Sequence, residues 1–160
     1  MLILDGKIAS AAVKATLLAQ TQALTTEGKR APHLAAILVG NNGASETYVA
    51  SKVKNCEETG FESTLIRLDV AVSEKILLDK IIELNNNPAI DGILVQLPLP
   101  KHIDEAKVIE TINPAKDVDG FHPLNVAKLA MEEPDGFVPC TPLGVQRMLL
   151  ASGTGGLAVS

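Results

Sequence analysis

The stretch that decides the fold is HLAAILV, at residues 33–39, followed directly by the turn GNNG at residues 40–43. A short, mostly apolar run that ends in a glycine turn is typical of a strand buried on both faces of a parallel sheet. Two similar runs follow along the chain, ESTLIRLD at 62–69 and IDGILVQL at 90–97. The sequence therefore predicts three buried or half-buried strands.

Helical segments separate these strands. Asp5, Ser45 and Ser73 are residue types that cap helices, and Thr141 stands before a proline in the position that a first helical turn tolerates. Helices are expected at residues 8–24, 45–59, 73–85, 104–112 and from 141 to a stop at Gly153. Strands that alternate with helices form βαβ units with right-handed crossovers. The predicted class is α/β: a three-layer βαβ domain with a mainly parallel sheet flanked by helices.

Composition excludes several classes of protein. The chain has 160 residues, 46% of them hydrophobic and 21% charged, which suits one globular domain. Its net charge is −5, with three arginines and no lysine-rich block, which argues against a nucleic-acid partner. No apolar run is long enough to span a membrane, and the first ten residues lack the pattern of a secretory signal, so we expect a cytoplasmic protein. Cys56 and Cys140 then read as free thiols, with no zinc pattern.

The helix expected after Gly43 carries a possible site. On a helical wheel Tyr48 and Lys52 lie close together at the edge of its apolar face, whereas Lys54 points away to solvent. No carboxylate lies three or four residues from Lys52, so its own helix offers no counter-ion. A half-buried ammonium group without an ionic partner is destabilised, and such a lysine can serve as a base. A lone Tyr-x-x-x-Lys pattern is also compatible with a lysine that merely extends to water.

Two further features point toward the same edge of the sheet. Gln96 interrupts an apolar strand near its carboxyl end, and parallel sheets bind ligands beyond those ends. It is also compatible with a polar residue that simply closes a strand. Asp117 and Asp119 stand two apart in KDVDG; a calcium loop is excluded because Lys128 occupies the position of the bidentate glutamate. An ordinary turn aspartate remains the alternative. We predict no metal site and no catalytic histidine.

Four motifs, taken in order and spacing, resemble one family. They are VGNNGASETYVASKVK, GILVQLPLP, KDVDGFHPLN and PCTPLGV. Together they resemble the methylenetetrahydrofolate dehydrogenase/methenyltetrahydrofolate cyclohydrolase family, the bifunctional FolD type, over roughly residues 1–150. The resemblance implies an oxidoreductase and hydrolase of one-carbon metabolism, and through it of purine biosynthesis. Such an enzyme oxidises methylenetetrahydrofolate with NADP, or sometimes NAD, and hydrolyses the methenyl product to 10-formyltetrahydrofolate.

The resemblance also implies roles for individual residues. Lys52 would be the central catalytic residue, Gln96 would hydrogen-bond it and help set its protonation state, and Tyr48 would pack against the folate. Asp119 would bind the polar edge of the pterin, where a carboxylate can accept two parallel N–H bonds. The substrate cleft would be shaped by Ser45, Leu97, Pro98, Leu99 and Pro100.

The family pattern also concerns the rest of the enzyme. It implies that residues 1–150 form the folate-binding catalytic domain and that residues 151–160 begin a linker to a Rossmann-type domain. That domain would bind NADP or NAD, so the cofactor-binding residues are expected beyond Ser160, and the full-length enzyme would be a homodimer. Two alternatives remain: a non-catalytic folate-binding module, and a short-chain dehydrogenase-like oxidoreductase, which also uses Tyr-x-x-x-Lys but needs a glycine-rich cofactor loop that residues 1–47 do not supply.

Overall fold

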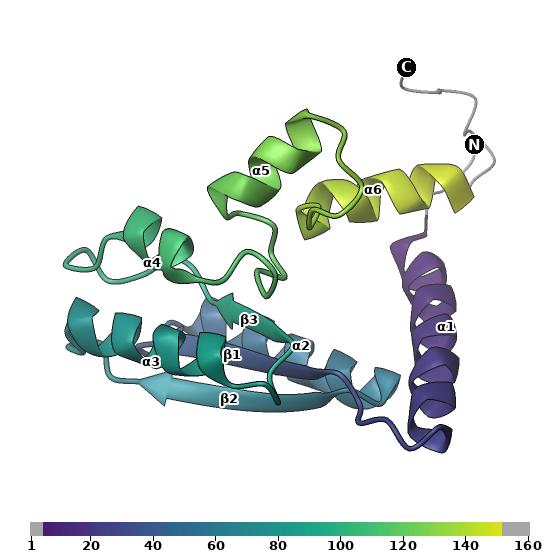
Figure 1. The fold of residues 1–160 in the computed structure, drawn as a ribbon, viewed down its shortest axis with the longest axis horizontal. Coiled ribbons are helices and arrows are strands. Elements are labelled where there is room, and N and C mark those ends of the chain that lie inside the picture. The colour runs from purple at the N-terminus through teal and green to yellow at the C-terminus, as the bar shows by residue number, and fades with distance from the viewer. Residues whose placement is uncertain (1–4, 152–160) are drawn as a thin grey trace.

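The computed structural model describes residues 5–151 and confirms the α/β class. Within this range three strands alternate with helices (Figure 1). The elements in chain order are α1 (Gly6–Thr26), β1 (His33–Val39), α2 (Gly43–Thr59), β2 (Glu62–Leu68), α3 (Glu74–Asn86), β3 (Gly92–Val95), α4 (Glu105–Thr111), α5 (Pro123–Ala130) and α6 (Cys140–Ala151).

The three strands form one parallel sheet with β1 at its centre, in the order β2-β1-β3. His33 pairs with Glu62 at one end of β1, and Ile37 pairs with Val95 near the other. Both crossovers run through a helix, β1-α2-β2 and β2-α3-β3. All three carboxyl ends therefore lie at one edge, and the chain leaves β1 and β3 there toward opposite sides of the sheet.

Side-chain alternation along β1 builds the three layers. Ala35, Ile37 and Val39 belong to the core cluster that α3 and α4 cover with Leu77, Ile81 and Val108. The even-numbered positions point the other way, toward α2, which contacts both β1 and β2 and buries Val49 and Cys56. Figure 1 shows α3 in front of the sheet and α2 behind it. The predicted arrangement of a sheet flanked by helices is confirmed.

Most element boundaries agree with the sequence prediction within two residues, and Asp5, Ser73 and Asp104 cap their helices through side-chain oxygens. The predicted cap of α2 was wrong. Asn42 caps it, because its Oδ1 accepts hydrogen bonds from the N–H groups of Ala44 (3.0 Å) and Ser45 (3.2 Å).

Two other boundaries differ from the prediction. Strand β3 ends at Val95, before Gln96, although the Gln96 N–H still donates to the Ile37 carbonyl at 2.9 Å. Helix α6 begins at Cys140, one residue before the predicted cap, Thr141. Its predicted stop, Gly153, lies outside the described residues.

The segment after α4 adds a fourth partner to the sheet. The Ile93 N–H donates to the Lys116 carbonyl at 2.7 Å, and Ile93 forms an isolated parallel bridge with Asp117. The loop that follows, residues 117–122, therefore starts beside β3 and leads to α5. Helices α5 and α6 lie above the sheet in Figure 1, and α1 stands at the side, in contact with α2 and α6.

Candidate functional site

Helix α2 presents Tyr48 and Lys52 at the edge of its buried face. Val49 is fully buried and anchors the helix on the sheet, and Ser45, in the first turn, is 6% exposed. Tyr48, one position before Val49, is 67% exposed. The Lys52 side chain, one turn further along, is 30% exposed. An aromatic ring and an amine thus stand one helical turn apart, as the wheel predicted, and Lys54 points to solvent with its side chain 74% exposed.

Lys52 has a counter-ion after all. Its Nζ lies 3.8 Å from Oδ1 of Asp119, which belongs to the loop of residues 117–122. The expectation of a lysine without an ionic partner was wrong, because it considered only the helix that carries Lys52. Helix α2 indeed offers no carboxylate to it, but the fold brings one from a distant loop. The structure thus joins two of the predicted site residues into one pair.

Asp119 sits in a setting that disfavours its charge. Burial raises the pKa of Asp119 above the usual carboxyl range, the Lys52 ammonium opposes that shift, and the neighbouring charge of Asp117 adds to it. A half-buried carboxyl with a raised pKa, close to an amine, is the kind of arrangement that proton-transfer sites use. The raised pKa of Asp119 therefore makes this carboxyl easier to protonate than an exposed one.

The two aspartates of KDVDG have different tasks. Asp117 is 2% exposed and accepts hydrogen bonds from the chain around it, including the Gly120 and His122 N–H groups at 3.1 and 2.8 Å. The turn-aspartate alternative therefore describes Asp117, whereas Asp119 is left to face Lys52. Spacing alone did not distinguish them.

Gln96 does not bond Lys52 in this structure, contrary to the prediction from the family pattern. Its Nε2 donates to the Leu97 carbonyl at 2.7 Å, and its Oε1 is buried without a hydrogen-bond partner among residues 5–151. If the amide were flipped, Oε1 of Gln96 would face the Leu97 carbonyl oxygen. The observed orientation is therefore the favourable one, and it leaves Oε1, a hydrogen-bond acceptor, as the unpaired atom. An unpaired buried acceptor is costly, and a donor from a ligand or from Lys52 would relieve that cost.

Leu97 and Asp119 line the same small hollow. Its other lining residues are Ile93, Val95, Val108, Ile109, Ile112, Asp117 and Phe121. The wall is thus apolar apart from the two carboxylates. Pro98, joined to Leu97 by a cis peptide bond, is exposed beside it. The predicted cleft residue Leu97 therefore shares a hollow with Asp119, whereas Tyr48 does not line this hollow.

Cys140 is a neighbour of the site that the sequence analysis missed. Its Sγ donates to the Val118 carbonyl at 3.4 Å, within the loop that carries Asp119. Desolvation and the negative charge of Asp119 raise the pKa of the Cys140 thiol, with Lys52 acting in the opposite direction. The available signal was the PCTPLGV motif, which the family resemblance included without giving the cysteine a role.

The three histidines serve the structure. His122 accepts the Leu124 N–H at the start of α5, His33 bonds Thr64, and His102 bonds the Val72 carbonyl. Within residues 5–151 no group of three metal-binding side chains comes together.

The first strand-to-helix turn does not fit a dinucleotide cofactor. A pyrophosphate would need free N–H groups at the N-terminus of α2, but Asn42 already occupies those of Ala44 and Ser45. The glycines of this turn also lack the spacing of a dinucleotide fingerprint. We therefore assign no nicotinamide cofactor to this turn. No helix in the described part of the chain is both long and apolar enough to traverse a lipid bilayer.

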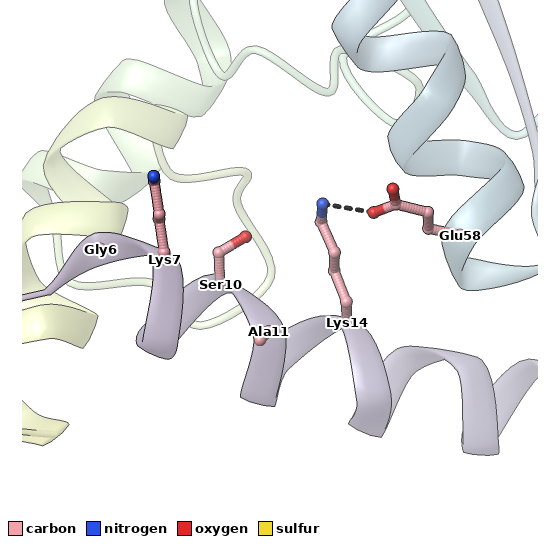
Figure 2. A pocket seen from close by; sticks show the side chains of 6 residues that line it. All are labelled: Gly6, Lys7, Ser10, Ala11, Lys14 and Glu58. Carbon is pink, nitrogen blue, oxygen red and sulfur yellow. Dashed lines mark hydrogen bonds and ion pairs between the residues drawn. The ribbon is translucent and has the colours of Figure 1, made fainter.

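A larger hollow, of about 340 Å³, lies between α1 and the end of α2 (Figure 2). It is lined by Gly6, Lys7, Ser10, Ala11, Lys14 and Glu58. Lys14 and Glu58 pair across it at 2.6 Å, so two of its three charged side chains neutralise each other. None of these residues belongs to the predicted site, and size alone does not make this open hollow the place of the chemistry.

Comparison with known proteins identifies the family of the chain. The family described as "Tetrahydrofolate dehydrogenase/cyclohydrolase, catalytic domain" matches residues 4–119. The chain is 53% identical over 149 residues to the bifunctional protein FolD of Flavobacterium johnsoniae, covering 93% of this chain and 50% of that protein. It is 53% identical over 148 residues to the FolD protein of Aquifex aeolicus, covering 92% and 51%.

Solved structures give the same result. The bifunctional enzyme FolD of Campylobacter jejuni superposes with a TM-score of 0.93 at 48% identity, covering 96% of this chain and 54% of that one. The Trypanosoma brucei FolD, solved with NADP and an inhibitor, gives 0.89 at 35% identity, with 95% and 52% covered. The chain spans about half the length of the curated relatives it matches. The sequence motifs, the fold and these matches agree: the chain belongs to the tetrahydrofolate dehydrogenase/cyclohydrolase family.

Proposed function

We propose that this chain supplies the folate-binding and catalytic part of a methylenetetrahydrofolate dehydrogenase and methenyltetrahydrofolate cyclohydrolase. The observation that carries the proposal is the Lys52–Asp119 pair, 3.8 Å apart at the carboxyl edge of a parallel sheet. Around it stand the unpaired Gln96 oxygen and the exposed Tyr48 ring. These groups suit a flat, polar-edged heterocycle that must be held while protons move.

Some of these residues bind the folate, and others transfer protons. Asp119 accepts hydrogen bonds from the polar edge of the pterin, and Tyr48 packs against the aromatic body of the folate. Leu97, Pro98 and Ser45 shape the cleft. Lys52 moves protons beside the reacting carbon, and the Gln96 oxygen accepts a hydrogen bond from it once a ligand is bound. The unpaired state of that oxygen supports this role, since binding would remove its cost.

The hydrolytic step needs one base that can also act as an acid. The methenyl group is a cation, so addition of water to its carbon releases one proton to solvent. Breaking the bond between that carbon and N5 then moves the remaining hydroxyl proton to N5, which leaves the formyl group on N10. The Lys52 amine accepts the hydroxyl proton and delivers it to N5, and Asp119 keeps the ring in place.

The oxidative step requires a hydride acceptor, NADP or NAD, which supplies the redox chemistry. We assign its binding to a Rossmann-type domain that residues 151–160 would lead into, with residues 1–150 as the folate-side domain. A cytoplasmic homodimer without a nucleic-acid partner is part of the same proposal. The relatives' roughly double length and the NADP-bound Trypanosoma brucei structure support the assignment of the cofactor to a further domain.

The test compares two lysines of one helix. Lys52→Met should lower the rate of methenyltetrahydrofolate hydrolysis by about 100-fold or more, the usual contribution of a general acid–base group. Lys54→Met is the matched control, because Lys54 is exposed and pairs only with Glu58 on the surface. Equal activity of the two variants would reject the assignment.

Calorimetry separates catalysis from binding alone. The chain should bind tetrahydrofolate, and Asp119→Asn should weaken that binding while circular dichroism shows an intact fold. Binding by the unmodified chain without any hydrolysis would favour the alternative, a non-catalytic folate-binding module.

A further inference from the structure

The loop that carries Asp119 is held by a buried hydrogen-bond network. At its centre is Asp117, whose Oδ1 accepts the Gly120 N–H at 3.1 Å and whose Oδ2 accepts the His122 N–H at 2.8 Å. A third donor is the Asn125 side chain, 2.9 Å from Oδ2. The loop thus closes around a buried carboxylate, and three N–H groups compensate its charge.

Asn125 connects this network to a separate segment. It lies in α5 and is 2% exposed. Its Nδ2 donates to Asp117 and to the Pro114 carbonyl (3.0 Å), and its Oδ1 accepts the Phe137 N–H at 3.2 Å. The Asn125 amide therefore joins three places: Pro114 before the loop, Asp117 within it, and Phe137 in the segment before α6.

That segment packs against the loop from the other side. Gly120 has φ +69°, and a Cβ on it would lie 2.8 Å from the Phe137 oxygen and 2.9 Å from the Pro139 nitrogen. Cys140, two residues beyond Val138, reaches back to the Val118 carbonyl. Residues 118–120, with Asp119 among them, are thus enclosed between Asp117 and residues 137–140.

We propose that Asn125 is a positioning residue for Asp119. By linking Asp117 to Phe137 it fixes both sides of the loop, and this holds the Asp119 carboxylate toward Lys52. Asn125 does not touch Lys52 or Asp119 itself among its hydrogen bonds, so its influence passes through the loop. The inference rests on the proposed function for the identity of the ligand, but its geometric part can be tested without any ligand.

The first test follows the titration of Asp119 by ¹³C NMR, with the signal assigned by its loss in Asp119→Asn. In Asn125→Ala the loop should open, water should reach the carboxyl, and the pKa of Asp119 should fall toward the ordinary range, because burial is the main cause of its raised value. The groups that face Asp119 are Lys52 on α2, Asp117 in its own loop and Cys140 on α6, and all three remain present in the variant.

Asn85 offers a matched control. It also bridges two segments with both sides of its amide, donating to the Thr111 carbonyl at 2.7 Å and accepting the Asn113 N–H at 2.8 Å. It makes no hydrogen bond to the loop of Asp119. Asn85→Ala should lose a similar amount of stability and leave the Asp119 titration unchanged. An unchanged Asp119 pKa in folded Asn125→Ala would overturn the proposal.

A second variant keeps the shape and changes only the donor. In Asn125→Asp a carboxylate can still accept the Phe137 N–H, but it cannot donate to Asp117 and repels it. Protonation restores a donor. Relative to wild type at the same pH, tetrahydrofolate should bind about tenfold more weakly at about pH 8 and recover at about pH 5. A ratio that does not change with pH would contradict the proposal.

The Asp119 titration and the folate-binding measurement distinguish two different failures. If Asn125→Ala does not fold, the pH-dependent recovery of Asn125→Asp decides the proposal. If the wild-type chain binds no folate, the proposed function is rejected, while the Asp119 titration in Asn125→Ala and Asn85→Ala still decides whether Asn125 positions that carboxyl.

Discussion

The Nζ of Lys52 and the Oδ1 of Asp119 face each other at 3.8 Å, one from a helix behind the sheet and the other from a loop beside its edge strand. The separation exceeds that of a hydrogen bond, so each group keeps its remaining capacity for a ligand. Burial raises the pKa of Asp119 even with the lysine present. The ionised Asp119 carboxylate is thus held there at a cost in stability, as expected for a group that serves the proposed function.

The first prediction concerns stability as a function of pH. Because the pKa of Asp119 is raised in the folded state, its ionisation costs stability as the pH rises through that raised value. Asp119→Asn should therefore increase the free energy of unfolding at neutral pH, and the gain should vanish near the ordinary carboxyl pKa of about 4. Urea unfolding at both pH values measures this; a destabilised variant at neutral pH would contradict it.

The second prediction concerns Gly120. An alanine there would meet both a left-handed backbone and the Phe137 oxygen, so Gly120→Ala should lose about 3 kcal/mol of unfolding free energy. Gly28→Ala is the control, since Gly28 has φ +78° but nothing within 4 Å of an added Cβ. It should lose only about 1 kcal/mol. Thermal and urea unfolding of the two variants would show whether crowding adds to backbone strain.

The third prediction concerns the contact between β3 and the site loop. A Cβ on Gly92 would lie 2.5 Å from Cγ1 of Val118. Gly92→Ala should therefore cost about 2 kcal/mol through overpacking. Adding Val118→Ala removes the opposing methyl, so the double variant should be more stable than the sum of the single losses predicts. Additive losses in a double-mutant cycle would mean that the two residues are not in close contact.

The fourth prediction concerns Lys116, which closes the end of α3. Its ammonium donates to the carbonyls of Leu84, Asn85 and Asn87 at 3.1, 2.9 and 2.8 Å. These carbonyls lie at the end of α3, where no further helical turn follows; those of Leu84 and Asn87 also accept the N–H groups of Asn87 and Ile90. Lys116→Met keeps the apolar stem but removes the donors, and should cost about 2 kcal/mol. Lys101→Met, on an exposed turn, should change the unfolding free energy by less than about 0.5 kcal/mol.

Apolar patterning predicted the framework well, because it depends on local sequence. The run at 33–39 became β1 without any change of boundary, and Ser73 caps α3 as expected. Strand β3 was predicted too long at both ends, because its ladder with β1 covers Gly92–Val95, although single hydrogen bonds from the Asp91 and Gln96 N–H groups still reach β1. The cap of α2 was misassigned because two suitable residues, Asn42 and Ser45, stand close together and only the backbone path selects between them.

The sequence named candidate site residues but did not predict their contacts. Helical geometry placed Tyr48 and Lys52 at one edge, but the partner of Lys52 comes from a distant loop that no periodicity places. The family resemblance gave Asp119 a binding role and Gln96 a hydrogen bond to Lys52. In the structure Asp119 pairs with Lys52, and the Gln96 amide bonds the Leu97 carbonyl instead. Asn125 lies within the quoted motif KDVDGFHPLN, yet nothing in the sequence alone distinguishes its buried bridge from an exposed helix residue.

Gly120 packs against the backbone of residues 137–139, and the next residue, Cys140, begins α6. The backbone that supports Asp119 is therefore continuous with the last described helix, and the thiol in the first turn of that helix bonds the same loop. A rotation of α6 would change the separation of the two opposite charges at the sheet edge. In the proposed function, the orientation of α6 would therefore set the distance between the Lys52 amine and the carboxylate that holds the ligand.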